Sequence, residues 1–545
     1  MSCLHARGSS QVELVSRGRV DRFNVELSRI GRAQQDRSSL PGLTLAIVHL
    51  GGTTELKAWG KKSEDGDKMT TDTVFNIGSC SKAFVSATIG ILIDDYAHGR
   101  NTTPLPAGLH KFDWDTKIQD LLPNEWKLMD PWASEKANVK DTLSHVSGLP
   151  RHENAYKPRD TPIMVTKRLR DLRPAFELRE QWLYNNQIYI VATHLVSTYT
   201  GSFARFVEDR IFKPLNMSQT TYFTNTAHAS GKATQTWTSF NLVAGPMGVI
   251  SGVEDLNKWV RMLLSYGVDP DTNQTIIPPS AFDTITSGRA VSDGNPSSQS
   301  GFSIVGYGLG WDRTSYLGHD IIEHGGGLPG ATALIIGALS DGVGLVVLAN
   351  ADEKSVATLT IAIAVARKMF GIHDSALARD RISDRIDESP PLTSSDIGRP
   401  PYTYTGTYIN HGYGTMVLCD ASSTSQYCID ILSAYGLVDG VPPSTSHGEL
   451  FTGLDTAWTS HARLAPIKDN EFIMRSTFLF PTGYGRNGTP FQTIVKRTMK
   501  ATFVVEDGVV AGLGLSGSVS QGPTMREKEG GSVEYVSDDW FDKIS

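Results

Sequence analysis

The chain has 545 residues, of which 39% are hydrophobic and 20% charged, and its formal net charge is −7. This length is too great for one ordinary hydrophobic core and favours two domains. No dense block of Lys and Arg occurs, so we expect neither a nucleic-acid partner nor an anionic-membrane partner. No apolar run reaches the roughly 18 residues that a membrane-spanning helix requires.

Residues 1–20 form a polar tail of mixed charge. The tail lacks the apolar segment of a signal peptide, which predicts a cytoplasmic protein. Asn-x-Ser/Thr triplets, which matter only in a secretory pathway, start at Asn101, Asn216, Asn273 and Asn487.

Two of the four cysteines, Cys419 and Cys428, flank a polar stretch (420–426) that we interpret as a hairpin loop between two short strands. The two thiols could face each other across this loop, but a buried pair of free thiols is favoured in a reducing compartment. No grouping of Cys and His has the spacing of a zinc site. We expect no metal and no cofactor.

Hydrophobic periodicity predicts the elements of the first part of the chain. In chain order they are an amphipathic helix (21–35), the two strands of a hairpin (42–50 and 53–59), two further strands (332–337 and 343–349) and a helix (355–370). Helix-rich sequence lies between the strands at the two ends. This order predicts an α+β fold, with one sheet built from both ends of the segment and a helical insertion.

The composition changes after this part. Residues 388–401 are rich in Pro and Ser, as linkers are, and we place the domain boundary there. From residue 402 to 545, short β-like runs recur between turns and helical periodicity is missing. The second part is therefore predicted to be a small all-β barrel or sandwich.

The most informative segment contains Ser79 and Lys82, at the start of an apolar stretch (85–93) that predicts a buried helix. The three-residue spacing places the hydroxyl and the amine on one helix face. A lysine kept neutral by burial can take the proton of a serine nucleophile, and the helix N-terminus favours the anion that forms. The alternative is an ordinary N-cap serine with a solvated lysine.

Two further segments carry residues suited to the same chemistry. Tyr184 and Asn186 form a Tyr-x-Asn triplet before a predicted helix (187–199), where a phenol can relay protons and an amide can hold an acyl carbonyl. A second such triplet, beginning at Tyr408, is expected to be structural. The segment 323–330 contains His324 followed by three glycines, whose N–H groups can form an oxyanion hole. The alternative is a glycine-rich turn with an exposed histidine.

Ser-x-x-Lys, Tyr-x-Asn and His-x-Gly, in this order, resemble the three motifs of the penicillin-recognising serine enzymes. The variant used here is similar to the class C β-lactamase branch with its esterase, D-aminopeptidase and acyltransferase relatives. Supporting stretches are 143–150, 248–256 and 307–311, while 404–408 resembles the start of a lipocalin-like C-terminal domain. The resemblance implies a catalytic domain over 21–387 with an antiparallel sheet flanked by helices and a helical subdomain.

The resemblance also implies a role for each motif residue. They are Ser79 as acylated nucleophile, Lys82 as its base, Tyr184 in proton transfer, Asn186, His324 and Gly326 in substrate binding, and the backbone N–H groups of Ser79 and Gly327 as oxyanion hole. His145, in the first supporting stretch, is expected to be a structural loop residue.

His324 stands where β-lactamases have a lysine, and a histidine carries a positive charge only partly near neutrality. We therefore expect poor β-lactam hydrolysis, with carboxylate-bearing substrates improving below about pH 6.5. The resulting interpretation is a serine hydrolase of a small ester or amide. The alternatives are an acyltransferase, then a D-aminopeptidase or β-lactamase, and last a non-catalytic scaffold, against which the intact Ser79, Lys82 and Tyr184 argue.

Overall fold

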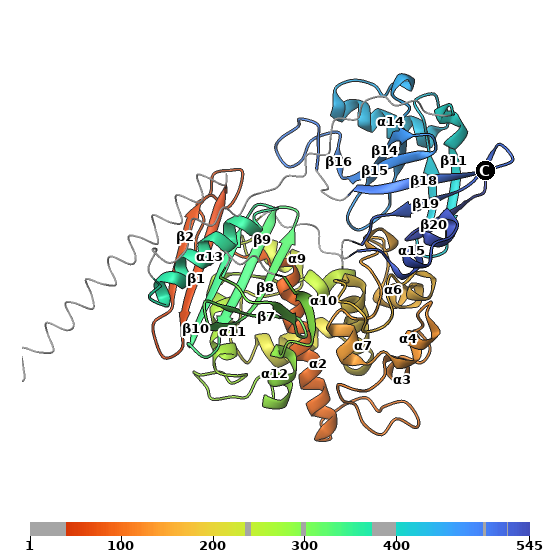
Figure 1. Ribbon diagram of the computed structural model, residues 1–545. Coiled ribbons are helices and arrows are strands. Elements are labelled where there is room, and N and C mark those ends of the chain that lie inside the picture. The colour runs from red at the N-terminus through yellow and green to blue at the C-terminus, as the bar shows by residue number, and fades with distance from the viewer. Residues whose placement is uncertain (1–39, 235–240, 296–300, 373–398, 494–497, 520–521) are drawn as a thin grey trace, which may run out of the picture.

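The computed structural model describes residues 40–234, 241–295, 301–372, 399–493, 498–519 and 522–545. The tail (1–20), the expected helix (21–35) and most of the expected linker (388–401) lie outside these ranges. The described chain contains two eight-stranded antiparallel sheets, one before and one after residue 373 (Figure 1). The α+β fold predicted from the element order is confirmed.

The first sheet joins both ends of its segment. Its spatial order is β2 (Glu55–Gly60), β1 (Gly42–His49), β10 (Val343–Ala349), β9 (Ala331–Ala338), β8 (His319–Leu328), β7 (Asp312–Tyr316), β6 (Val305–Tyr307) and β5 (Ala290–Asp293). The expected hairpin is β1–β2, and β1 pairs with β10 from the far end of the segment.

Both faces of this sheet are covered, so its central strands are apolar throughout. Along β1, Leu43, Leu45 and Ile47 share a core cluster with α13 (Ser355–Met369). Ala46 and Val48 belong to the cluster on the opposite face. That face is packed by α11 (Val253–Leu264), and its cluster includes α2 (Lys82–Ala97). The alternation of side chains along a strand explains this division.

The helical insertion lies between β3 (Phe75–Asn76) and β4 (Ile250–Ser251). Its helices are α3 (Ile118–Leu121), α4 (Pro131–Lys136), α5 (Val139–Leu143), α6 (Pro162–Arg168), α7 (Asn186–Thr200), α8 (Phe203–Val207), α9 (Thr224–Ala229) and α10 (Ala244–Met247). The helix α12 (Pro279–Thr286) follows α11 and packs on α2. Because α2 is enclosed by α7, α10 and α12, it is apolar nearly all round. None of the helices in the described part of the chain combines the length and the hydropathy that a membrane span requires.

The C-terminal domain is a nearly closed barrel. Its strand order is β12 (Gly414–Leu418), β11 (Gly406–Asn410), β20 (Asp539–Lys543), β19 (Val509–Ser516), β18 (Thr498–Glu506), β15 (Glu471–Thr477), β14 (His461–Lys468) and β13 (Leu450–Gly453). Cys419 and Phe451 exchange two backbone hydrogen bonds of 2.8 Å, which join the first strand to the last. This closure confirms the predicted β-barrel character.

Two features of this domain differ from expectation. A 14-residue helix, α14 (Gln426–Asp439), lies where helical periodicity was not detected, because exposed Ile429 and Leu437 obscure its buried stripe. Cys419 and Cys428 form a disulfide, so the expectation of free thiols is wrong. The stretch between them connects a strand to α14 rather than two strands, which brings the two cysteines together.

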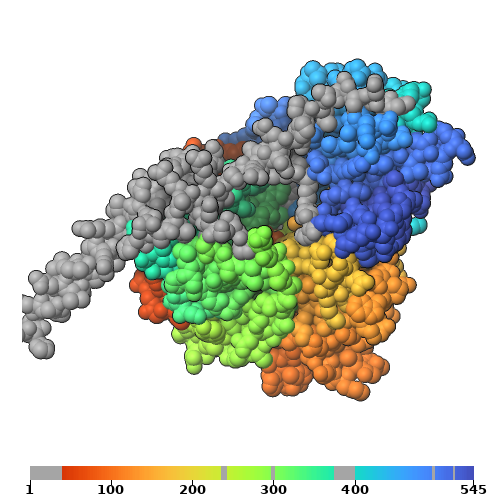
Figure 2. Space-filling model, in the orientation of Figure 1, coloured from red at the N-terminus to blue at the C-terminus, as the bar shows by residue number. Residues whose placement is uncertain are grey.

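The C-terminal domain packs on the helical insertion (Figures 1 and 2). The Arg173 guanidinium donates to the carbonyl of Glu534 at 2.6 Å, and the Met525 N–H donates to the carbonyl of Ala175 at 2.9 Å. His152 Nδ1 lies 2.8 Å from the Tyr413 hydroxyl. These polar contacts hold the barrel beside the segment that follows residue 150.

We expect the disulfide to stabilise the C-terminal domain by about 2–4 kcal/mol, because it closes a loop that would otherwise be free in the unfolded chain. The double variant Cys419→Ser/Cys428→Ser should lower the free energy of unfolding of this domain by that amount in urea titrations. Reducing agent should produce the same loss in the native chain and none in the variant. Equal stability of the native chain with and without reductant would contradict this.

Candidate active site

Ser79 lies in a 3-10 turn, η1 (Gly78–Ser81), that leads directly into α2. The turn packs against β8, whose residues from His324 onward pair with β9 only, because β7 ends its pairing at Asp312. This strand is internal to the sheet, but among the described residues its segment beside Ser79 has a strand partner on one side only. The glycine-rich segment, interpreted above as a possible turn, is part of this strand.

Lys82 is fully buried, with an exposed fraction of 0%. Its Nζ lies 3.2 Å from Ser79 Oγ, 2.8 Å from Asn186 Oδ1 and 3.0 Å from the carbonyl oxygen of Pro246. Burial lowers the pKa of Lys82 well below its ordinary value, and the nearby Arg151 lowers it further. A neutral amine can therefore exist beside the serine hydroxyl at moderate pH.

Tyr184 also lies beside this amine. The Lys82 Nζ is 4.6 Å from the centre of the Tyr184 ring. Burial raises the pKa of Tyr184, and its hydrogen bond with Ser79 and the charge of Arg151 offset this only in part. The phenol thus stays protonated where Lys82 has lost its proton. Tyr184 is suited to donate a proton rather than to act as a phenolate base.

Both the oxygen and the nitrogen of the Asn186 side-chain amide form hydrogen bonds within the protein. Its Oδ1 accepts from Lys82, and its Nδ2 donates to Glu153 Oε1 at 2.9 Å. The Arg151 guanidinium in turn donates to Glu153 at 2.8 Å. Asn186 therefore orients Lys82, and a contact with substrate stays a prediction.

Arg151 and Glu153 lie in the site but were not predicted from the sequence motifs. They directly follow the supporting stretch 143–150, which was the available signal.

His324 is buried, and its Nε2 lies 3.2 Å from the Tyr307 hydroxyl. Burial first, and then the neighbouring Lys82, lowers the pKa of His324 to about 3. The expectation that this side chain gains charge below about pH 6.5 is therefore wrong, because desolvation outweighs the solution value of imidazole. The Nδ1 of His145 accepts the backbone N–H of Asn185 at 3.1 Å, which supports the structural role expected for this residue.

The three glycines of β8 differ in their surroundings. A Cβ on Gly326 would lie 2.0 Å from the carbonyl oxygen of Ile77, so only glycine allows β8 to approach the turn. Gly326 lines neither cavity at Ser79, so the structure shows a packing role for it, and its expected role in substrate binding stays a prediction. The backbone nitrogen of Gly327 lies 2.7 Å from the Cβ position of Gly78, beside the serine turn.

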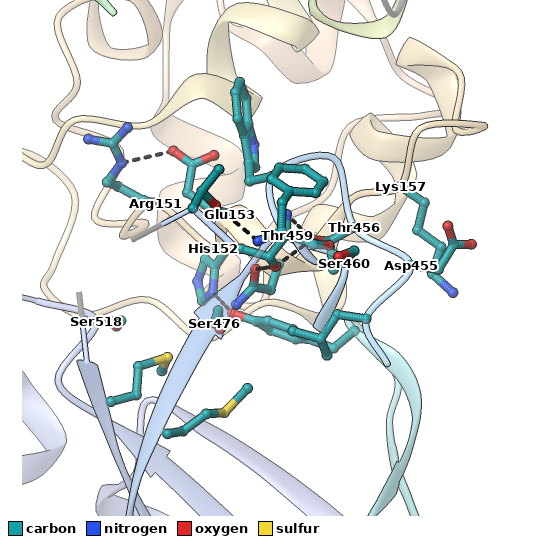
Figure 3. A pocket seen from close by; sticks show the side chains of 18 of the residues that line it. Arg151, His152, Glu153, Lys157, Asp455, Thr456, Thr459, Ser460, Ser476 and Ser518 are labelled. Carbon is teal, nitrogen blue, oxygen red and sulfur yellow. Dashed lines mark hydrogen bonds and ion pairs between the residues drawn. The ribbon is translucent and has the colours of Figure 1, made fainter. Parts of the chain in front are cut away.

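Two cavities meet at Ser79. The smaller, about 450 Å³, is lined by Tyr184, His324 and Asp312 among others. The larger, about 1020 Å³, is lined by Asn186 and by residues of the C-terminal domain. Figure 3 shows Arg151, Glu153, Lys157 and Asp455 among the side chains that line this larger pocket, which both domains form. A bound molecule can therefore extend from Ser79 in two directions.

Gly326→Ala should destabilise the protein by about 1–3 kcal/mol, because the added methyl group overlaps the Ile77 carbonyl. Gly325→Ala is a matched control, since a Cβ there meets no atom within 4 Å. Its free energy of unfolding should stay within about 0.5 kcal/mol of the native value. Equal losses in the two variants, measured by denaturant titration, would contradict the packing role.

The chain resembles two curated enzymes over most of its first part. It is 27% identical over 360 residues to an unguisins hydrolase of Aspergillus campestris, covering 62% of this chain and 63% of that protein. It is 24% identical over 345 residues to a D-aminopeptidase of Gluconobacter oxydans, covering 61% of this chain and 59% of that protein. The chain thus spans about three fifths of the length of these relatives.

Among solved structures, a penicillin-binding protein homologue from Pyrococcus abyssi superposes with a TM-score of 0.52 at 16% identity. The superposition covers 90% of this chain and 97% of that one, and it shows a common fold. The family model described as Beta-lactamase matches residues 27–368, which is more than half of the chain. The protein therefore belongs to the beta-lactamase family.

Proposed function

We propose that the protein hydrolyses a small-molecule amide or ester through an acyl intermediate on Ser79. The main support for this proposal is the buried Lys82 amine, which lies 3.2 Å from Ser79 Oγ and has a strongly lowered pKa. The named relatives support amide or ester hydrolysis, since one is a hydrolase and the other an aminopeptidase. A scaffold without activity would have no reason to keep an amine buried, because burial of a lysine is costly.

In the proposed acylation, the neutral Lys82 amine donates its two hydrogens to Asn186 Oδ1 and the Pro246 carbonyl. Its lone pair then points to Ser79 and accepts the hydroxyl proton. Oγ attacks the substrate carbonyl carbon, and the negative charge moves to the carbonyl oxygen. Backbone N–H groups of Ser79 and Gly327 are proposed to stabilise this oxyanion.

Collapse of the tetrahedral intermediate breaks the bond to the leaving group, which needs a proton. The protonated Tyr184, hydrogen-bonded to Ser79, can supply this proton and recover one from the Lys82 ammonium. Water then attacks the acyl-serine by the reverse proton path and releases the acid. The leaving group thus lies on the Tyr184 side of the serine.

Acyl transfer is the second candidate, and the pair of cavities at Ser79 favours it. After the leaving group departs, the smaller cavity has room for an acceptor other than water. Product analysis with an added amine distinguishes the two, because hydrolysis gives only acid whereas transfer gives a new amide.

A fluorophosphonate probe should label Ser79, and no other residue, because the adjacent amine activates this hydroxyl. Intact-protein mass spectrometry should give one adduct on the native chain and none on Ser79→Ala. Lys82→Ala should slow labelling about a hundredfold or more, the usual contribution of general-base assistance. Full labelling of Ser79→Ala would refute the proposed nucleophile.

The specificity constant kcat/KM should be lost as the pH falls through the Lys82 pKa, because only the neutral amine accepts the serine proton. On the acid side of the pH profile, the fall in kcat/KM should therefore occur well below the pKa of an ordinary lysine. Arg151 lowers the Lys82 pKa and Glu153 raises it. Arg151→Gln should thus move the acid limb to higher pH and Glu153→Gln to lower pH.

The measurement is kcat/KM for p-nitrophenyl acetate across pH in the native chain and the two variants. Each variant serves as the control for the other, since both remove one partner of the same ion pair. Shifts in the same direction would show that loss of the pair, rather than the charge on Lys82, controls the limb.

A further inference from the structure

The larger cavity extends from Ser79 into the mouth of the C-terminal barrel. On β15, Phe472 and Met474 point inward while Ile473 and Arg475 lie on the partly exposed outer face. Met474 lines the cavity, whereas Phe472, two residues before it on the same strand face, does not. The barrel interior is therefore open at the end nearest the serine.

The far end of the barrel is filled by aromatic rings. The ring centres of Tyr404, Phe472 and Phe503 are 4.6–5.3 Å apart, and none of these residues lines the cavity. An eight-stranded barrel has just enough interior for side chains or one small ligand. Here the aromatic rings close one half and leave a chamber in the other.

The wall of this chamber is mainly apolar and adaptable. Its apolar inward-facing residues are Met416, Met474, Met499, Leu515 and Phe541, and Ser476 adds one hydroxyl on the same face of β15 as Met474. Methionine side chains are flexible and polarisable, so they accommodate apolar groups of varied shape. The charged residues Arg151 and Glu153 line the same cavity but belong to the catalytic domain, where Glu153 accepts a hydrogen bond from Asn186 beside the serine site.

We propose that this chamber binds the acyl group of the substrate, and that this group is large and apolar. The inference rests on the proposed function, in which the leaving group lies at Tyr184. Tyr184 lines only the smaller cavity, so the acyl group must extend the other way, past Asn186. The full cavity, about 1020 Å³, is at the upper end of the sizes found for ligand sites.

The first test is a series of p-nitrophenyl esters with a constant leaving group: acetate, butyrate, octanoate and dodecanoate. The value of kcat/KM should rise about twofold to fourfold for each added methylene until the chamber is full. A series of acetate esters with longer alcohols should show no comparable rise. A flat acyl series, or a rise confined to the alcohol series, overturns the proposal.

Two neighbouring substitutions on β15 provide a matched comparison. Met474→Trp fills the chamber and should lower the ratio of the octanoate to the acetate specificity constants at least tenfold. Ile473→Trp places the same side chain on the outer face and should leave this ratio unchanged. Met499→Trp, on the strand paired with Met474, repeats the test if the first variant does not fold. The proposal is overturned if the octanoate-to-acetate ratio is the same in the variants that fill the chamber as in Ile473→Trp.

A binding measurement separates this inference from the proposed function. Ser79→Ala protein is titrated with dansyl-undecanoic acid, and Met474→Trp should weaken its binding at least tenfold relative to Ile473→Trp. Binding without hydrolysis of any ester would refute the proposed function and support the chamber. Hydrolysis without chain-length dependence, or no binding, would refute the chamber.

Discussion

The site depends on the complete burial of one amine. Lys82 is the first residue of α2, and α2 is enclosed by the sheet and by neighbouring helices, so its first residue has no access to solvent. Desolvation disfavours the charged form, and Arg151 adds to this effect. A buried amine also needs partners, which Asn186 and the Pro246 carbonyl provide. The packing around the start of α2 therefore also sets the protonation behaviour of the Lys82 amine.

The close approach of β8 to the serine turn is the second requirement. Gly326 allows contact with the Ile77 carbonyl, and the end of β7 leaves the neighbouring edge of β8 without a strand partner. The backbone of Gly327 thus reaches the turn at a place where a sheet would otherwise continue. A side chain at Gly326 would separate the two elements, so the position of the Gly327 backbone beside the serine turn depends on the packing of its neighbour.

The C-terminal domain lines one of the two cavities at Ser79. Its barrel is closed by the backbone pairing of Cys419 with Phe451 and docks on the helical insertion through Arg173. One half of the barrel is filled by aromatic rings, and the other opens toward Ser79. The walls around the serine therefore come from residues hundreds of positions apart.

The features that depend on local spacing could be predicted from the amino-acid sequence. The separation of Ser79 and Lys82 by three residues, the Tyr-x-Asn triplet at Tyr184 and the alternation in the strands are all properties of short segments, and each predicted its element. Other features depend on which segments pack together. The lowered pKa of His324, the disulfide of Cys419 and the cavity shared by two domains follow only from the way distant segments pack. These features depend on burial and on contacts between residues far apart in the chain, which cannot be read from a short stretch of sequence.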